Sequence, residues 1–352
     1  MSKGISREVF DAVNSIMTTG RQGAVMPVTP GTMYGPGMDA AGAATGMAFL
    51  VGELEKLDPR VLEPLTSITA PEDITMKAGG GWVSNVSNVF VDYATTGNDE
   101  DAIIAGETTN IPVSQANLTK DLFKVNTFAE VLRVPLLDEN KLQQIGRSLS
   151  QILDDGLRLN YNKIIDRNVY VGISKTGTYG LVNNTAITAG YAAAGASGSR
   201  LWANKTPDEI LYDVNYAIQY TWAQSEYDLT GMATDILIDP ANYAAICNRK
   251  VSSAGNMSIL EYLLQNNIAK NQGRKLSIRP RRWCIGAGTG TTQRMVCYVN
   301  AENRVNMHST VPLSRVMTAP NTQSLSYETV YTAQFSQVIF LYTQCALYQD
   351  GI

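Results

Sequence analysis

The sequence predicts a mixed α+β protein. Residues 138–170 carry apolar side chains at the three- and four-residue spacing of an amphipathic helix. Runs rich in Val, Ile, Phe, Tyr and Thr occur at 82–93 and 118–134, and recur after residue 276, as is typical of strands. Shorter helices are expected between about 180 and 310. This middle segment separates two parts of the chain, which together hold the long helix and the final strands.

Composition narrows the functional class. The chain has 352 residues, enough for two domains or one large one, with a net charge of −4. A protein whose main task is to grip phosphates concentrates Lys and Arg, so such a role is disfavoured. No signal-peptide segment or membrane-spanning apolar run is recognised, and the four cysteines are expected to be reduced and mostly buried.

The N-terminal region predicts an extension followed by a helix. Residues 1–38 are rich in Gly, Met and Pro and indicate an arm, and residues 39–57 favour a helix. Pro59 makes Asp58 a poor helical position, so this helix should end there. Residues 71–82 are expected to form a glycine-rich join.

The stretch FVDYATTGNDEDAIIAGETTNIP, residues 90–112, is an acidic excursion between the two strands at 82–93 and 118–134. A hairpin normally turns in two to five residues, and this one takes more than twenty. Five acids and no base lie between Lys77 and Lys120, so this segment is more negative than the whole chain. The acids are Asp92, Asp99, Glu100, Asp101 and Glu107. An isolated two-stranded ribbon is marginal in water, so we expect the excursion to lie on another surface.

The long predicted helix offers that surface in a second copy of the chain. Asp138 can cap its start, and Arg147, Arg158 and Arg167 supply positive charge along it. We expect the acidic excursion of one copy to lie over this basic side of the next. Such charges set register, while Ile103 and Ile104 would contribute more of the stabilisation.

Sequence signals also place the helices of the middle segment. Thr206 and Glu209 form a capping box with Pro207 at the first helical position, and Ser258 and Glu261 form a second one, opening ILEYLLQNNIAK. The intervening run Ile236–Ile238 favours a short buried strand, after which Asp239 begins a helix.

No catalytic, metal or cofactor site is expected. The single histidine, His308, lies in a strand-like run, and no P-loop occurs. GAGTGT at 286–291 favours a turn between strands, and Asp154 and Asp155 are expected to be solvated. The basic cluster Arg274, Lys275, Arg279, Arg281 and Arg282 is either a solvated edge or a subunit contact.

The order of these elements resembles the tailed-phage major capsid proteins of HK97-like fold. The resemblance covers nearly the whole chain and is strongest in LDPRVLEPL, AGETTNIPVSQANLTKDLFKVNTF, TYGLVNN, PDEILYDVN, ILIDPANYAAI and ALYQDGI. It implies an N-terminal arm and helix at 1–80, an extended loop hairpin at 81–135, a peripheral domain with a spine helix at 136–180, an axial domain at 181–310, and closing strands of the peripheral domain at 311–352.

The resemblance also implies a function. Pentamers and hexamers of the chain would form an icosahedral virion shell, assembled in the host cytoplasm and enclosing double-stranded DNA without sequence-specific contacts. Separate scaffolding, portal and decoration proteins are possible partners. Some relatives cross-link through a loop lysine, but residues 78–119 contain none. The alternatives are an encapsulin-like nanocompartment shell, a non-viral β-rich surface protein and an enzyme with an unrecognised site.

Overall fold

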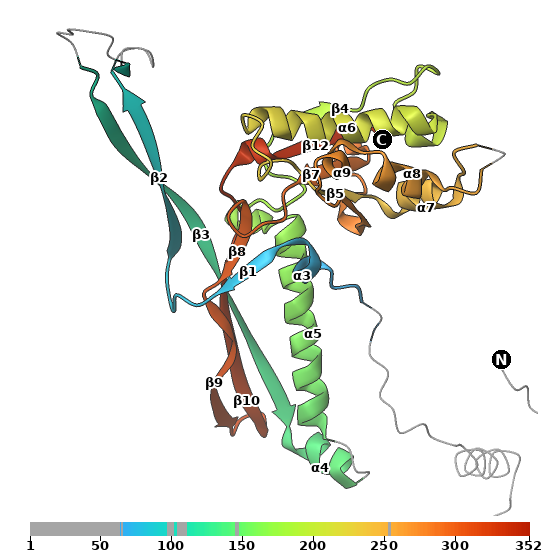
Figure 1. Ribbon diagram of the computed structural model, residues 1–352. Helices are drawn as coiled ribbons and strands as arrows, with labels where there is room; N and C mark the ends of the chain where they lie inside the picture. Colours follow the sequence, from blue (N-terminus) through green and yellow to red (C-terminus); the bar gives the residue numbers. More distant parts are fainter. Residues whose placement is uncertain (1–63, 65, 97–101, 104–110, 145–147, 253–254) are drawn as a thin grey trace, which may run out of the picture. The chain divides into compact units, whose positions relative to one another are not determined.

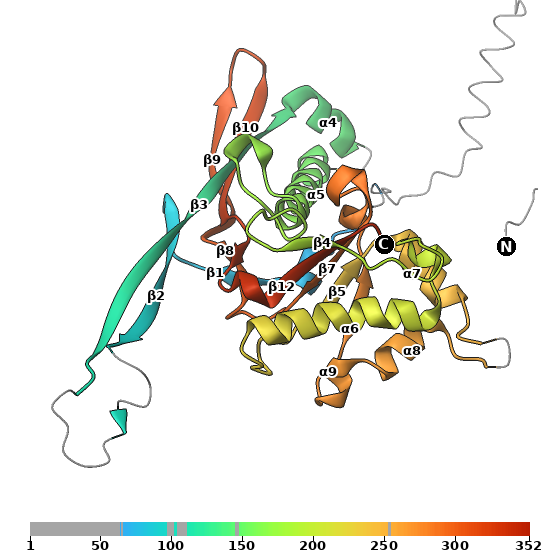
Figure 2. The same ribbon diagram turned by 90° about the horizontal axis from the view of Figure 1, so that it is seen from above.

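The computed structural model (Figures 1 and 2) describes residues 64, 66–96, 102–103, 111–144, 148–252 and 255–352. The chain divides into two units, Met1–Leu65 and Thr66–Ile352, and the fold given below is that of the second. The predicted helix at 39–57 therefore lies outside the described residues. None of the described helices is long and apolar enough to cross a membrane.

Two long strands form the predicted hairpin. β2 (Asn85–Thr95) pairs antiparallel with the first half of β3 (Ser114–Pro135), in register from Asn85 opposite Lys124 to Thr95 opposite Ser114. The second half of β3, from Val125 onward, pairs with β10 (Ser326–Ser336), which pairs in turn with β9 (Val311–Asn321). The resulting sheet has the order β2-β3-β10-β9, so one uninterrupted strand belongs to both the hairpin and the sheet (Figure 1).

The single helix predicted at 138–170 is wrong in one respect, because the structure contains two helices there. α4 (Leu136–Gln144) ends before the undescribed residues 145–147, and α5 (Leu149–Tyr170) follows. Ser148 caps α5, its hydroxyl accepting from the Gln151 amide at 3.3 Å. Glu139 of α4 also accepts from the Ser150 amide at 3.0 Å. The apolar stripe continues through both helices, but the cap at Ser148 begins a new helix.

α5 is attached to the body by apolar contacts at both ends. Leu157 packs with Leu132 and Val134 of β3 and Tyr331 of β10, which forms one small core. The C-terminal turns of α5 enter a larger core through side chains that include Val169. The helix has 22 residues, so it spans about 33 Å at 1.5 Å per residue.

The middle segment is built on a five-stranded sheet of order β4-β12-β7-β5-β6. Its strands are β4 (Ala189–Tyr191), β5 (Asp235–Ile238), β6 (Ser277–Pro280), β7 (Arg294–Tyr298) and β12 (Ala346–Asp350). β12 comes from the last residues of the chain and pairs with β7 and β4. The sheet therefore joins a strand from the predicted closing segment, 311–352, to strands of the predicted axial segment, 181–310.

Four helices accompany this sheet: α6 (Pro207–Gln224), α7 (Pro240–Asn248), α8 (Ile259–Gln265) and α9 (Ile268–Asn271). The capping box at Thr206 is confirmed, with Thr206 and Glu209 bonding each other's backbone amides, and Asp239 caps α7 as expected. The helix expected from Ser258 onward is shorter than predicted. Asn267 caps α9, because its side chain accepts from the Lys270 amide at 2.8 Å, so the run divides in two.

The predicted glycine-rich join is partly wrong, because it contains regular structure. Residues 70–73 form a short helix, α3 (Ala70–Asp73), and β1 (Thr75–Ala78) pairs parallel with β8 (Val305–Ser309). β11 (Ile339–Phe340) completes this three-stranded sheet. Only Gly79, Gly80 and Gly81 act as a join, all with positive φ, a backbone region that glycine tolerates without a Cβ clash.

Short 3-10 turns occupy residues 174–176, 202–204, 282–284, 289–291 and 343–345. The fourth lies within GAGTGT, between β6 and β7, so the predicted turn is confirmed. All four cysteines are free, and three of them are buried, as expected.

Candidate assembly surfaces

One face of the β2–β3 ribbon is an exposed row of apolar side chains. Residues paired across the strands share a face, and Val91 is opposite Leu118 while Ser87 is opposite Leu122. Side chains two residues apart lie on the same face, so Val89 and Tyr93 join them. We call this set the ribbon face: Val89, Val91, Tyr93, Leu118 and Leu122. Tyr93 is 78% exposed and Leu118 is 68% exposed, so nothing in the described chain covers it.

Near its base the ribbon touches the body through both of its faces, with Phe90 on the face opposite the ribbon face and Lys124 on the same face as Leu122. Phe90 packs edge-on against Tyr342, with ring centroids 6.3 Å apart. The Val83 amide donates to the Gln334 side chain at 3.1 Å, and the Lys124 ammonium donates to the Thr176 carbonyl at 3.2 Å. These contacts fix the base of the ribbon and leave its apolar face open.

The structure places only part of the predicted acidic excursion. Asp92 is exposed on β2, on the face opposite the ribbon face. Ile103 is 77% exposed. Asp99, Glu100, Asp101, Ile104 and Glu107 lie outside the described residues. The apolar row at 89–93 and 118–122 was not predicted from the sequence, although the partial alternation that places Val, Val and Tyr at 89, 91 and 93 is a signal for it.

The basic residues of the long helix are not equivalent. Arg158 is exposed, and its Nε donates to Asp154 Oδ2 at 3.0 Å, one turn earlier. Arg167 is exposed near the end of α5, and Arg147 lies outside the described residues. The expectation that Asp154 is solvated holds only in part, because its side chain is 28% exposed. Hydrogen bonds from Tyr331 and then Arg158 hold the pKa of Asp154 below its usual value, whereas Asp155 is exposed. Within one chain, no ion pair joins these arginines to Asp92 among the described residues.

A buried polar network, also missed from the sequence, holds the chain where it enters the second unit. Asp73 of α3 is fully buried, and it accepts from Arg281 Nε at 2.5 Å and from Arg279 Nη1 at 2.6 Å. The Tyr170 hydroxyl also donates to it. Burial and then the Asp73 charge raise the pKa of Tyr170 far above its usual value, so this phenol stays protonated. Arg281 is therefore buried and Arg279 is partly buried, both are paired within the chain, and the prediction of a solvated edge is wrong for them.

Asp166 of α5 is a second buried anchor beside the first. Its Oδ1 accepts from the backbone amides of Thr69 and Ala70 at 2.8 and 2.9 Å, and its Oδ2 accepts from Trp283 Nε1 at 2.9 Å. Arg282 completes the pairing at 3.3 Å. A carboxylate that accepts several N–H bonds is satisfied even when buried. The network consequently ties residues 69–73 to α5 and to the segment after β6.

The described residues contain no cluster of three or more His, Cys, Asp or Glu side chains that could hold a metal ion. His308 lies in β8, where burial and then Lys77 lower its pKa below the usual value. This histidine has the structural setting that the sequence indicated.

Comparisons with known proteins decide the family. A model of the family described as "Major capsid protein" matches residues 99–352. This chain belongs to the major capsid protein family. It is therefore a structural protein of a virion that assembles with copies of itself. A comparison with curated proteins found no match.

Solved structures agree on the fold, which is HK97-like. The capsid of Myoviridae phage XM1 is 16% identical, with a TM-score of 0.70, and the match covers 86% of this chain and 98% of that one. A Microbacterium phage Oxtober96 structure is 12% identical, with a TM-score of 0.58 and coverage of 89% and 98%. The capsid of a native GTA particle is 10% identical, with a TM-score of 0.56 and coverage of 89% and 99%. The HK97-like fold expected from the order of the elements is confirmed.

Proposed function

We propose that this major capsid protein forms pentamers and hexamers that close into an icosahedral shell around double-stranded DNA. The proposal assigns residues 1–80 to an arm, 81–135 to the extended loop, 136–180 and 311–352 to a peripheral domain, and 181–310 to an axial domain, with β12 contributed to the axial sheet. Assembly in the host cytoplasm, with separate scaffolding, portal and decoration proteins, belongs to the same proposal.

The ribbon face is the observation that carries the proposal. Five exposed apolar side chains gather on one face of the ribbon, around the Lys120 cation, and a clustered apolar surface rimmed by polar groups marks a protein–protein contact. Burying a Leu- or Val-sized side chain is worth roughly 1.5–3 kcal/mol, so covering this face by a neighbouring copy would stabilise assembly strongly. An unsupported two-stranded ribbon is only marginally stable in water, so contact with a neighbouring copy would also stabilise the ribbon itself.

The acidic excursion would have a secondary, electrostatic role in assembly. Asp99, Glu100, Asp101 and Glu107 would lie near exposed cations of the adjoining copy, with Arg167 the described candidate that has no ion-pair partner among described residues. Arg158 is already paired with Asp154, so its contribution would be smaller. The charges would select the register of a contact whose free energy comes mainly from apolar burial.

The negative net charge of the chain fits a container better than a DNA-binding protein. With −4 overall, the shell would enclose DNA without gripping its phosphates. We therefore expect free subunits to bind added double-stranded DNA only weakly in a binding assay.

Adjacent residues on opposite faces of the ribbon provide a matched test. Leu118 lies on the ribbon face and Thr119 on the other, and both are exposed. We expect purified wild-type chain to form rings or shells in negative-stain electron micrographs. Leu118→Asp should reduce particle yield at least tenfold while far-ultraviolet circular dichroism stays unchanged, and Thr119→Asp should have a much smaller effect. A stable wild-type monomer at high concentration, or equal yields for the two variants, would contradict the proposal.

A further inference from the structure

An exposed row of tyrosines runs along α6. Tyr212, Tyr216 and Tyr220 are four residues apart, so they lie on one side of the helix. The Tyr212 and Tyr216 rings stack with centroids 6.4 Å apart, and the Tyr220 ring is tilted to Tyr216 at 6.5 Å; Tyr212 is 60% exposed and Tyr216 is 47% exposed. Tyr220 Oη donates to Thr188 Oγ1 at 3.2 Å, directly before β4. The Tyr220 end of this tyrosine ridge therefore lies beside β4, an edge strand of the five-stranded sheet, whereas Asp208, one turn before Tyr212, accepts from Tyr262 of α8 at 2.7 Å.

The chemistry of the ridge favours a protein partner over a nucleic acid. α6 contains Asp208 and Glu209 in its first turn and no Lys or Arg, whereas a phosphate backbone requires cations. Arg200, near the same edge, lies over the Tyr191 ring at 4.7 Å. Tyrosine is enriched in protein interfaces because it combines a rigid apolar ring with a polar hydroxyl.

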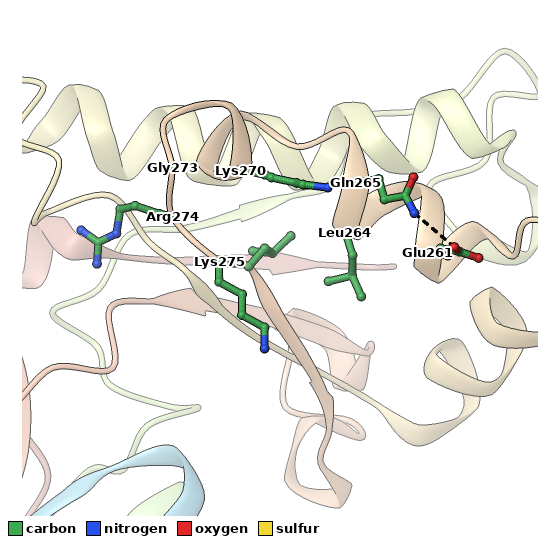
Figure 3. Close-up of a pocket in the computed structure, with 8 residues that line it drawn as sticks. Glu261, Leu264, Gln265, Lys270, Gly273, Arg274 and Lys275 are labelled. Carbon is green, nitrogen blue, oxygen red and sulfur yellow. Dashed lines mark hydrogen bonds between the residues drawn. The ribbon is translucent and has the colours of Figure 1, made fainter.

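A cavity of about 510 Å³ lies at the other edge of the same sheet, next to β6. Leu264 and Leu276 form its apolar wall, and Lys270, Arg274 and Lys275 surround it with positive charge. In Figure 3, Leu264 and Lys275 extend away from α6, the long helix at the top. Glu261 is engaged by the Gln265 side chain at 3.1 Å. We call this the lysine pocket; its volume lies within the range of ligand sites, so an aromatic side chain has room in it.

We propose that the tyrosine ridge of one copy docks in the lysine pocket of the next copy within a capsomer. Two features of the chain identify a second copy as the occupant. The ridge supplies aromatic faces and the exposed carboxylate of Asp208, one turn before Tyr212, and the pocket supplies cations and an apolar wall, so the two are complementary in charge and in cation–π contact. The two surfaces are also different patches of the chain, since the Tyr220 end of the ridge lies beside β4 and the pocket lies beside β6.

The difference between the two patches has a consequence for the symmetry of the assembly. A contact between two different patches of identical chains is head-to-tail, and it produces a closed ring when the rotation closes. A contact between two tyrosine ridges would instead produce only a two-fold dimer. The inference rests on the proposed shell function and specifies which surfaces hold neighbouring axial segments together.

Cysteine cross-linking tests the contact in the full-length chain. Tyr216→Cys and Lys275→Cys are combined in a Cys247→Ser background, since the other three native cysteines are buried. Wild-type particles are first confirmed by electron microscopy under the same conditions. Oxidised particles of the double variant should produce a non-reducing gel ladder that ends at five and six chains, and each single variant should remain monomeric on the gel.

The possible outcomes distinguish the ridge–pocket contact from the shell function. Normal particles without a ladder overturn the ridge–pocket contact and leave the shell function intact. Dimers from Tyr216→Cys alone show ridge against ridge and also overturn the contact. If the wild-type chain forms no rings or shells, the proposed function fails and the contact fails with it.

Substitution of the ridge provides a second measurement. Tyr212→Ser combined with Tyr216→Ser should reduce particle yield at least tenfold with unchanged circular dichroism. Tyr179→Ser removes an exposed tyrosine outside the ridge and should have little effect. Equal yields from the ridge variant and wild type would overturn the proposal.

Discussion

Arg294 and Asp350 form a two-pronged ion pair inside the five-stranded sheet. Arg294 Nε lies 2.6 Å from Asp350 Oδ1, and Nη2 lies 2.8 Å from Oδ2, with the side chains 9% and 2% exposed. Thr289, within the GAGTGT turn, donates its amide to the same carboxylate at 2.8 Å, and Arg294 Nη1 donates to the Val182 carbonyl at 2.8 Å. The pair thereby ties the end of β12, the last strand of the chain, to β7 and to two loops.

Arg294→Met should destabilise the unassembled chain by about 3–5 kcal/mol, because it leaves Asp350 buried without a counter-charge. Burial alone would raise the pKa of Asp350, yet hydrogen bonds from Arg294 and Thr289 hold it below the usual value. In the wild type this carboxylate therefore contributes stability at pH values above about 3.8, and that contribution is lost as the pH falls further.

In the Arg294→Met variant the sign reverses. Burial is then less opposed, so the pKa of Asp350 rises above its unfolded value and the cost is greatest at neutral pH. Urea denaturation at pH 7 and pH 4.5 should show a smaller loss at the lower pH. Arg133→Met is the control, because the Arg133–Glu328 pair is exposed and screened by solvent, so its loss should destabilise the chain much less. Equal losses for the two variants would contradict the role assigned to the buried pair.

Asp73→Asn should loosen the attachment of residues 69–73. The buried guanidinium of Arg281 would lose its buried charged partner and keep only the exposed Glu72 carboxylate, at a cost of about 3 kcal/mol. Tryptic cleavage after Lys77, followed by mass spectrometry, should be faster in the variant. Glu72→Gln alters the neighbouring carboxylate, which is 63% exposed, and should leave the cleavage rate nearly unchanged. Similar rates for both variants would sink the anchoring role.

Two glycines of the α5 region should respond to alanine in opposite directions. A Cβ at Gly156 meets no atom within 4 Å, so Gly156→Ala should stabilise the helix by about 0.8–1 kcal/mol. Gly172 has φ +74, and a Cβ there would lie 2.3 Å from the Thr178 carbonyl oxygen, so Gly172→Ala should be destabilising. Thermal unfolding of the unassembled variants checks both signs, and a gain from Gly172→Ala would refute the described backbone.

Thiol reactivity should follow burial. Burial raises the pKa of the Cys284 and Cys297 thiols far above the usual value, and Cys345 shifts in the same direction. Cys247 is half-buried, so iodoacetamide should label it first in the native chain, and the other three should react only on unfolding. Mass spectrometry of tryptic peptides measures the order, which would be wrong if Cys297 reacted early.

Reversing the charge of the acidic excursion should affect assembly more than folding. Changing Asp99, Glu100 and Asp101 together to Lys should reduce the yield of regular particles and increase misformed ones, since the positive segment would meet the cations of the adjoining copy. Asn, Gln and Asn at these positions separate loss of charge from reversal. Electron microscopy at low and high salt measures both, and unchanged particle yield and shape would remove the electrostatic part of the proposal.

Local patterns predicted the elements whose causes are local. The capping box at Thr206 and the cap at Asp239 satisfy amides within three residues, so four or five letters are enough to locate them. The alternation around Val89 and Val91 predicted strands for the same reason. Ser148 and Asn267 are caps too, but they lie within continuous apolar patterns, and the periodicity concealed them.

Long-range partners could not be predicted in this way. Asp73 and Arg281 are about two hundred positions apart, and a sequence shows only that one is an acid in a Pro-Glu-Asp turn and the other a base in a cluster. The placement of β12 beside β4 and β7 likewise depends on which edge of the sheet is free once the other strands have paired. The exposed ribbon face was visible as alternation, but its lack of cover is a property of the folded chain.

The continuity of β3 determines how a load on the ribbon reaches the rest of the subunit. Its partner changes from β2 to β10 between Lys124 and Val125 without a break in the strand. A pull along the ribbon is therefore carried by the backbone and resisted by the whole β3–β10 ladder in shear, where many hydrogen bonds must yield together. Pressure from packed contents would create tension between adjoining subunits. The continuous strand β3 would pass that tension from the ribbon to the sheet beside α5.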